Sequence, residues 1–142
     1  MSLDVALLRS SFDLVVAREP HVTARFYEIL FSRHPQARSL FGGRSDAVQA
    51  EMLRQALVAV LEHLEDSAWL VQTLGALGQK HAEYGVTREM YDWVGASLLA
   101  ALAEVAGDQW TPELESAWRE AYGAIASLMQ SGASAAARSA SG

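Results

Sequence analysis

The fold is decided by one stretch of the chain, residues 67–85, which reads SAWLVQTLGALGQKHAEYG. Its apolar residues recur at spacings of four and three, the period of one helix face: Leu70, Leu74 and Leu77. His81 continues this stripe four residues further on, and Gly85 accepts the left-handed backbone that ends a helix. The stretch therefore predicts a helix whose apolar face ends in a histidine.

The same helical period extends in both directions from this stretch, and almost no sustained alternation of period two occurs. We therefore predict an all-α fold. The expected helix starts are Val5, Pro20, Pro35, Ser45, Ser67, Thr87 and Thr111. The clearest of these signals is Thr111-Pro112-Glu113, which combines a capping hydroxyl, a first-turn proline and a first-turn acid. Gly42-Gly43 and Gly107-Asp108 are expected to end helices.

The length and composition predict one folded domain. A chain of 142 residues with 51% hydrophobic and 20% charged residues is large enough for a single hydrophobic core. From Ser131 onwards the helical pattern is replaced by a run of Ser, Gly and Ala. We expect a folded domain over residues 1–130 and a disordered tail over residues 131–142.

Charge and residue usage exclude several classes of function. Lys and Arg number 11 against 17 Asp and Glu, and the net charge of -6 repels nucleic-acid phosphates and anionic membranes. The absence of cysteine excludes thiolate nucleophiles, disulfides and cysteine-ligated metals. No apolar segment reaches the roughly 20 residues that cross a bilayer, and the N-terminus lacks a secretory pattern. We expect a cytoplasmic protein with no nucleic-acid or membrane partner.

Three polar residues, Tyr27, Gln49 and His81, lie on stripes that are otherwise apolar. Buried polar groups must be paired or must have a function. Tyr27 fits a core tyrosine whose hydroxyl seeks a partner, and Gln49 fits either an inward amide or a half-solvated residue near a helix end. His81 fits a core histidine satisfied by the backbone, or a metal ligand oriented by an N–H bond to the Leu77 carbonyl.

The remaining histidines, His21, His34 and His63, lie beside prolines or acidic residues and are expected at the surface. No zinc-binding histidine pair on one helix face, phosphate-binding glycine loop or nucleophile elbow occurs in the sequence. Hydrolase, nucleotide-binding and acyl-transfer functions therefore have no support.

Several separated motifs carry a resemblance to a known family. They are Phe26-Tyr27, Phe31, His34-Pro35, Leu40-Phe41, Gln49-Ala50-Glu51-Met52-Leu53, Leu77-Gly78-Gln79-Lys80-His81, Tyr84-Gly85-Val86, Tyr91, Val94-Gly95 and Trp118-Arg119-Glu120-Ala121-Tyr122-Gly123. In order and spacing they resemble bacterial single-domain haemoglobins and the globin domain of flavohaemoglobins, over about residues 3–130. Periodicity alone leaves a helix bundle and a globin-like packing open. The resemblance implies a globin fold of about six to seven helices around a haem pocket.

The resemblance also implies a cofactor, haem b (iron protoporphyrin IX), and assigns residues to it. His81 would be the proximal iron ligand, with Tyr91 supporting it, and Tyr27 and Gln49 would be the distal hydrogen-bond donors. The other implied haem contacts are Phe41 on the haem face, Leu53 on the distal side, Lys80 toward a propionate, and Leu77, Val86 and Val94. The proximal glutamate of flavohaemoglobins has no counterpart, because its place falls at Ala133.

The implied function is reversible binding of dioxygen, with carbon monoxide and nitric oxide as further ligands. Hydroxyl and amide donors in a low-dielectric pocket hold polarised dioxygen more strongly than water does. Bound dioxygen would combine with nitric oxide to give nitrate and ferric haem, and a separate reductase would restore the ferrous state. We expect no self-contained enzyme, since the flavin and nicotinamide domains of flavohaemoglobins do not follow.

Two alternatives remain open from the sequence. One is a haem-based gas sensor or redox partner protein, in which ligand binding shifts a contact surface. The other is a globin-fold interaction domain without haem, in which His81 is a core residue and Tyr27 and Gln49 have protein partners.

Overall fold

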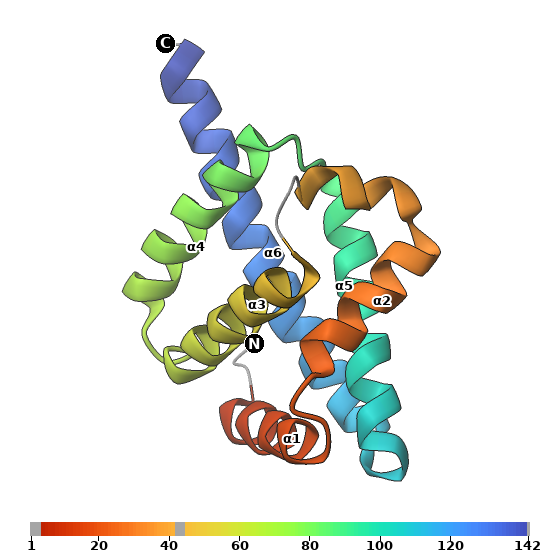
Figure 1. Cartoon of the computed structure of the whole chain (residues 1–142). Coiled ribbons are helices and arrows are strands. Elements are labelled where there is room, and N and C mark those ends of the chain that lie inside the picture. The colour runs from red at the N-terminus through yellow and green to blue at the C-terminus, as the bar shows by residue number, and fades with distance from the viewer. Residues whose placement is uncertain (1–3, 42–44, 142) are drawn as a thin grey trace.

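The computed structural model describes residues 4–41 and 45–141, with side chains for residues 4–40 and 45–133. These residues form helices and no strands, which confirms the all-α prediction (Figure 1). The α-helices are α1 (Val5–Arg18), α2 (Val22–Arg33), α3 (Asp46–Glu62), α4 (Ser67–Glu83), α5 (Arg88–Ala106) and α6 (Pro112–Ser141). Two 3-10 helices, η1 (Pro35–Phe41) and η2 (Gly107–Gln109), follow α2 and α5.

Local signals account for most helix ends. The Ser45 hydroxyl accepts the Val48 N–H at 3.2 Å at the start of α3, and the Thr111 hydroxyl accepts the Leu114 N–H at 3.2 Å at the start of α6. Gly85 and Gly107 have φ values of 92° and 56°, a conformation that favours glycine and that stops α4 and α5. The expected stop at Gly42-Gly43 lies outside the described residues.

Two helix starts differ by a residue or two from the prediction. Asp66, rather than Ser67, caps α4, because its carboxylate accepts the Trp69 N–H at 3.1 Å. A carboxylate accepts this bond more strongly than a hydroxyl, and its charge suits the positive end of the helix dipole. α2 begins at Val22, so Pro20 precedes the helix instead of entering its first turn.

The tail predicted to be disordered is helical over residues 131–141, where α6 continues to Ser141. Five of these residues are Ala, the strongest helix former. Extending a helix that already exists avoids the cost of nucleating a new one. In Figure 1 this end of α6 projects beyond α4.

The helices cross at steep angles instead of lying in a parallel bundle (Figure 1). α4 packs along α6, α2 packs across α5, and α3 packs against α2. The described side chains form two hydrophobic clusters. The larger one centres on α1, α2, α5 and the first half of α6, and includes Leu8, Phe26, Leu102 and Trp118. The smaller one joins the end of α3 to α4, the start of α5 and the middle of α6 through Val60, Leu74, Tyr91, Ala126 and Met129.

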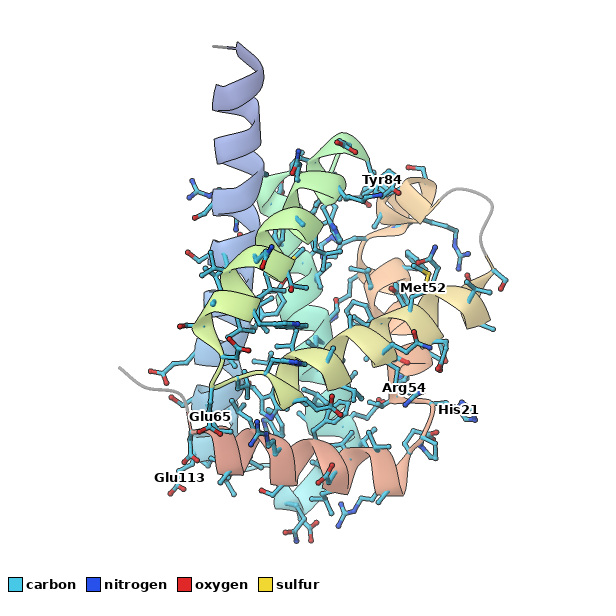
Figure 2. The ribbon with its side chains drawn as sticks, turned by 90° about the vertical axis from the view of Figure 1, so that its left-hand side faces the viewer. His21, Met52, Arg54, Glu65, Tyr84 and Glu113 are labelled. Carbon is cyan, nitrogen blue, oxygen red and sulfur yellow. The ribbon has the colours of Figure 1, made fainter. Side chains whose placement is uncertain are left out.

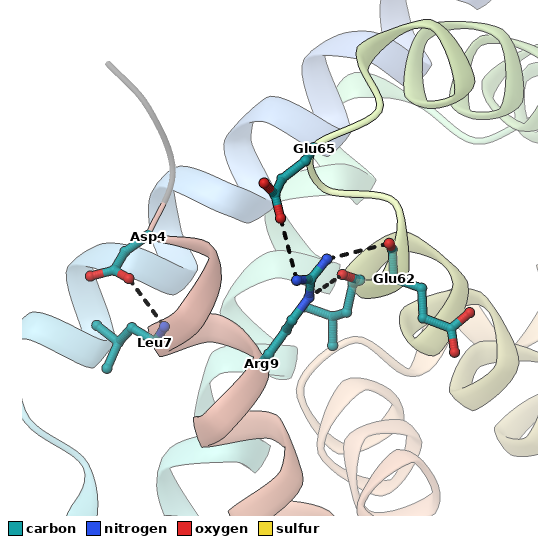
Figure 3. A network of polar contacts seen from close by, with 6 residues as sticks. Asp4, Leu7, Arg9, Glu62 and Glu65 are labelled. Atoms are coloured by element: carbon teal, nitrogen blue, oxygen red, sulfur yellow. Dashed lines mark hydrogen bonds and ion pairs between the residues drawn. The ribbon is translucent and has the colours of Figure 1, made fainter.

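Arg9 of α1 ties the first helix to the end of α3 (Figure 3). Its guanidinium donates to the carbonyls of Leu61 at 2.8 Å and Glu62 at 3.3 Å, and forms an ion pair with Glu65 at 3.4 Å. The last carbonyls of a helix lack partners within that helix, so a cation at this position satisfies them. Arg9 thereby fixes the far end of α3 against the larger cluster.

Polar side chains such as His21, Glu65 and Glu113 lie at the outer surface, where Met52 and Tyr84 are also exposed (Figure 2). In the part of the chain that the structure describes, no helix has both the length and the apolar character needed to span a membrane.

Candidate functional site

His81 lies near the end of α4, on the face that turns toward the interior, and is half-buried. Its Nδ1 lies 2.8 Å from the carbonyl oxygen of Leu77, one helical turn back. A carbonyl only accepts hydrogen bonds, so in a neutral imidazole this contact places the proton on Nδ1 and leaves the lone pair on Nε2. The hydrogen bond predicted from the sequence spacing is therefore present, and it prepares Nε2 to bind a metal.

Two glycines hold α4 against α6. A Cβ at Gly78 would overlap the backbone of Met129, and a Cβ at Gly132 would overlap the backbone of Gly75. The two helices thus approach each other backbone to backbone, which only residues without a side chain allow. Because Gly78 lies three residues before His81, this contact fixes the position of the imidazole along α6.

Tyr27 and Gln49 are buried on two other helices, α2 and α3. The Tyr27 ring packs edge-on against Phe26 at 4.8 Å and stacks with Phe31 at 5.7 Å. Burial raises the pKa of Tyr27 to about 12, so its hydroxyl keeps its proton at neutral pH and remains a donor. The two residues thus place a hydroxyl and an amide in a low-dielectric interior, as the sequence pattern indicates.

The apolar residues expected around the cofactor divide between the two hydrophobic clusters. Tyr27, Leu53 and Val94 belong to the larger cluster or pack on it, whereas Leu77, Val86 and Tyr91 belong to the smaller cluster or pack on it. Leu53, Leu77 and Val94, which lie on inward-facing helix stripes, and Val86, which lies between α4 and α5, are only half-buried. The two clusters therefore present half-covered apolar faces of the kind that a flat hydrophobic group would cover.

Two further haem contacts are expected, at Phe41 and Lys80. Phe41 ends η1, but its side chain lies outside the described residues. Lys80 is exposed next to His81. Both assignments remain predictions.

Tyr91 is buried at the start of α5, and its role in supporting His81 remains a prediction. The Nδ1 of His81 is bonded to the Leu77 carbonyl. Tyr91 accepts a hydrogen bond through its backbone carbonyl. The Tyr122 hydroxyl donates to the Tyr91 backbone carbonyl at 2.6 Å. Burial raises the pKa of Tyr91. The pKa of Tyr122 is also raised, mainly by burial and to a smaller extent by the nearby Tyr91 and Asp92. Both phenols are therefore neutral at ordinary pH.

Sequence reasoning did not single out Tyr122 as a site residue. It belongs to the motif Trp118-Arg119-Glu120-Ala121-Tyr122-Gly123, but only the fold reveals the residue that it contacts. A usable signal was its place on the inward stripe of α6, between Trp118 and Ile125. A tyrosine on such a stripe needs a hydrogen-bond partner for its hydroxyl.

Two of the three histidines expected at the surface are half-buried instead. His34 stacks on Trp93 at 4.4 Å, and His63 stacks on Trp69 at 3.9 Å while its Nδ1 lies 2.8 Å from the Ala59 carbonyl. The imidazoles are planar and share apolar contact area with the indoles, which the acidic sequence around His63 does not reveal. His21 is exposed, as predicted.

The globin family model matches residues 24–129 of this chain. The chain belongs to the globin family. Over 126 residues, this globin is 33% identical to a flavohemoprotein of Rhodopirellula baltica, a match that covers 87% of this chain and 31% of the relative. The chain thus spans about a third of the length of the curated relatives it matches.

Solved structures agree with this fold. An engineered carbene transferase from Rhodothermus marinus, made from a candidate nitric oxide dioxygenase, has a TM-score of 0.83 and 28% identity, with 97% of this chain and 96% of that one covered. A protein of Pseudomonas aeruginosa described as highly homologous in structure to a human hemoglobin has a TM-score of 0.80 and 25% identity, with 90% and 96% covered. The predicted globin fold is confirmed.

The side chains of this globin fit a haem. One imidazole supplies one ligand, which suits an iron whose four equatorial ligands come from a porphyrin. The half-covered faces of the two clusters suit the apolar macrocycle. Family and relatives together imply a haem-binding globin.

Proposed function

We propose that this globin binds haem b with His81 as the iron ligand and Tyr27 and Gln49 as donors to a bound diatomic gas. The observation that carries the proposal is that His81, on the interior-facing side of α4, bonds through Nδ1 to the Leu77 carbonyl, which orients the ring and leaves Nε2 to bind the iron. When bound, haem would supply the iron that takes up the gas and changes oxidation state.

The distal residues would decide which gas is held and for how long. When bound, haem would polarise dioxygen more strongly than carbon monoxide, so hydrogen-bond donors at the site would discriminate between the two gases. The protonated Tyr27 hydroxyl and the Gln49 amide therefore favour dioxygen and slow its release. Leu53, half-buried on the same helix as Gln49, would keep water away from the gas.

We further propose that this globin converts nitric oxide to nitrate when a separate reductase supplies electrons. One dioxygen, one nitric oxide and one electron give one nitrate, so each cycle requires one electron from outside. The description of the Rhodothermus marinus protein as a candidate nitric oxide dioxygenase supports this reaction class. The buried donors on α2 and α3 would hold the dioxygen in place for the second gas to reach it.

The test is an absorption spectrum after addition of haem, recorded for the ferric state, the ferrous state, and the ferrous state under dioxygen and under carbon monoxide. We expect a stoichiometric Soret band that shifts with each gas. His81→Ala should lose the ferrous spectrum of the native protein and regain it with added imidazole. An unchanged ferrous spectrum in this variant would refute the ligand assignment.

His63→Ala is the matched control, because the Nδ1 of His63 bonds to the carbonyl four residues back in the same way. This variant should keep the native spectrum. Nitric oxide conversion is tested without a reductase, by mixing the oxygenated ferrous protein with nitric oxide and measuring nitrate. One nitrate per haem is expected, and the absence of nitrate would reject the second proposal.

A further inference from the structure

Arg38 lies on η1 and contacts both of the helices that carry the buried donors. Its guanidinium lies over the Phe31 ring of α2, 4.4 Å from the ring centre. One of its nitrogens also forms an ion pair with Asp46, the first residue of α3, at 3.3 Å. A planar guanidinium makes such a stack and an ion pair at the same time, which an ammonium does not.

Each of these contacts connects Arg38 to one of the two donors through one other residue. Phe31 stacks on Tyr27 with an angle of 27° between the rings, so the Arg38 guanidinium contacts the ring on which the donor tyrosine stacks. Asp46 lies three residues before Gln49, within one turn of α3. The amide and the hydroxyl come from different helices, and Arg38 contacts α2 near its C-terminal end and α3 at its first residue.

We propose that Arg38 is a positioning residue that sets the distance between the Tyr27 hydroxyl and the Gln49 amide. It acts through Phe31 and Asp46 and does not touch the gas itself. This inference rests on the proposed function, because it assigns Arg38 to the distal donors of that function. It predicts that the release of dioxygen responds to a surface ion pair.

Salt should affect one of the two contacts. The Arg38 and Asp46 side chains are 60% and 68% exposed, so dissolved ions screen their attraction. The stack of Arg38 on Phe31 depends less on salt, because much of it is apolar contact. Salt should therefore weaken the link to α3 while leaving most of the link to α2 intact.

The experiment measures the rate of dioxygen dissociation from the haem-loaded protein at low and at high salt. Arg38→Leu removes both contacts and should raise the rate about threefold at low salt, the size expected from one exposed stack and one exposed ion pair. Asp46→Asn removes only the ion pair, so its rate should equal that of the native protein at high salt. Arg38→Lys keeps the charge and should restore only part of the effect.

Arg54→Leu is the matched control, since it removes the same charge and an exposed ion pair with Glu51 on α3 without separating two helices. Its dissociation rate should equal that of the native protein at each salt concentration. If Arg38→Leu and Arg54→Leu release dioxygen equally fast, Arg38 has no positioning role.

A second measurement, hydrogen exchange of the haem-free chain, separates this inference from the proposed function. Arg38→Leu should speed exchange in the first turns of α3 and in η1, and Arg54→Leu should not speed exchange in η1. Native protein that takes up no haem would overturn the proposed function. Native protein that binds dioxygen, with unchanged exchange and release in Arg38→Leu, would overturn this inference alone.

Discussion

His81 and Gln49 come from two helices that are held in different ways. On α4, Gly78 brings the backbone against that of Met129 in α6, with no flexible side chain between the two helices. On α3, Gln49 follows a helix start that is fixed by the Ser45 cap and by the exposed ion pair of Asp46 with Arg38. A backbone contact does not adjust, whereas a side-chain contact at the surface does.

This difference matches what the proposed function requires of each side. An iron ligand must keep one geometry through every cycle. The bond from His81 to Leu77 lies on α4, which together with its backbone contact to α6 forms the rigid side of the site. Donors to a gas must let it enter and leave, and Tyr27 and Gln49 lie on the side with adjustable contacts. The predictions that follow test this division, beginning with the largest expected effect.

Gly78→Ala should disrupt the backbone contact between α4 and α6. Its methyl group would overlap the Met129 backbone, so α4 must move away from α6 and carry His81 with it. We expect a loss of about 3 kcal/mol in the free energy of unfolding, measured by urea denaturation, together with weaker haem uptake. Gly123→Ala is the control, since a Cβ there meets nothing and should stabilise the helix by about 0.5 kcal/mol. Equal stability of the two variants would contradict a close α4–α6 contact.

Tyr27→Phe and Gln49→Leu should each remove a distal donor, on α2 and α3 respectively, without unfolding the protein. Each removes one donor to bound dioxygen, and a hydrogen bond to a charged partner contributes about 2 kcal/mol, equivalent to roughly 30-fold faster dissociation. Stopped-flow measurement of dioxygen release tests this effect. Gln55→Leu, an exposed glutamine on the same helix, should leave the rate unchanged. Native rates in both donor variants would mean that these groups do not face the gas.

On both sides, contacts between residues close in the chain can be predicted from the sequence, whereas contacts between distant residues cannot. The helix ends and the His81–Leu77 bond follow from spacings of a few residues, and within the described residues those predictions are confirmed except at Pro20, Ser67 and the tail. The Gly78–Met129 contact joins residues 51 positions apart, and a glycine inside a helical pattern does not indicate which backbone approaches it. The Arg38 contacts and the Tyr122–Tyr91 bond likewise depend on tertiary packing alone.

Alkaline pH should weaken the folded state through its buried phenols. The pKa of Tyr27 is about 12 in the folded state against 10.0 for an exposed tyrosine. Between these values the unfolded chain releases the proton and the folded chain keeps it. The free energy of unfolding therefore falls as pH rises through this window, and below about pH 10 none of it is lost through Tyr27. Across this window the shift of Tyr27 lowers the free energy of unfolding by about 3 kcal/mol. Urea denaturation at several pH values should show a shallower alkaline decline in Tyr27→Phe.

Tyr84→Phe is the control for this pH effect, because Tyr84 is 57% exposed. Its stability should decline with alkaline pH as steeply as that of the native protein. An equally steep decline in Tyr27→Phe would show that the Tyr27 hydroxyl is not in an apolar environment. The assignment of Tyr27 as a protonated donor would then lose its physical basis.

The smallest expected effect concerns the bond from Tyr122 to the Tyr91 carbonyl, which joins α6 to the start of α5. Tyr122→Phe keeps the ring that packs against Gly95 and removes only the hydroxyl, so the loss should be about 1 kcal/mol in urea denaturation. Because His81 is held separately by Leu77 and by the glycine contact, the ferrous spectrum should be unchanged. A shifted ferrous spectrum would show that the rigid side depends on the α5–α6 link as well, and that its parts act as one unit.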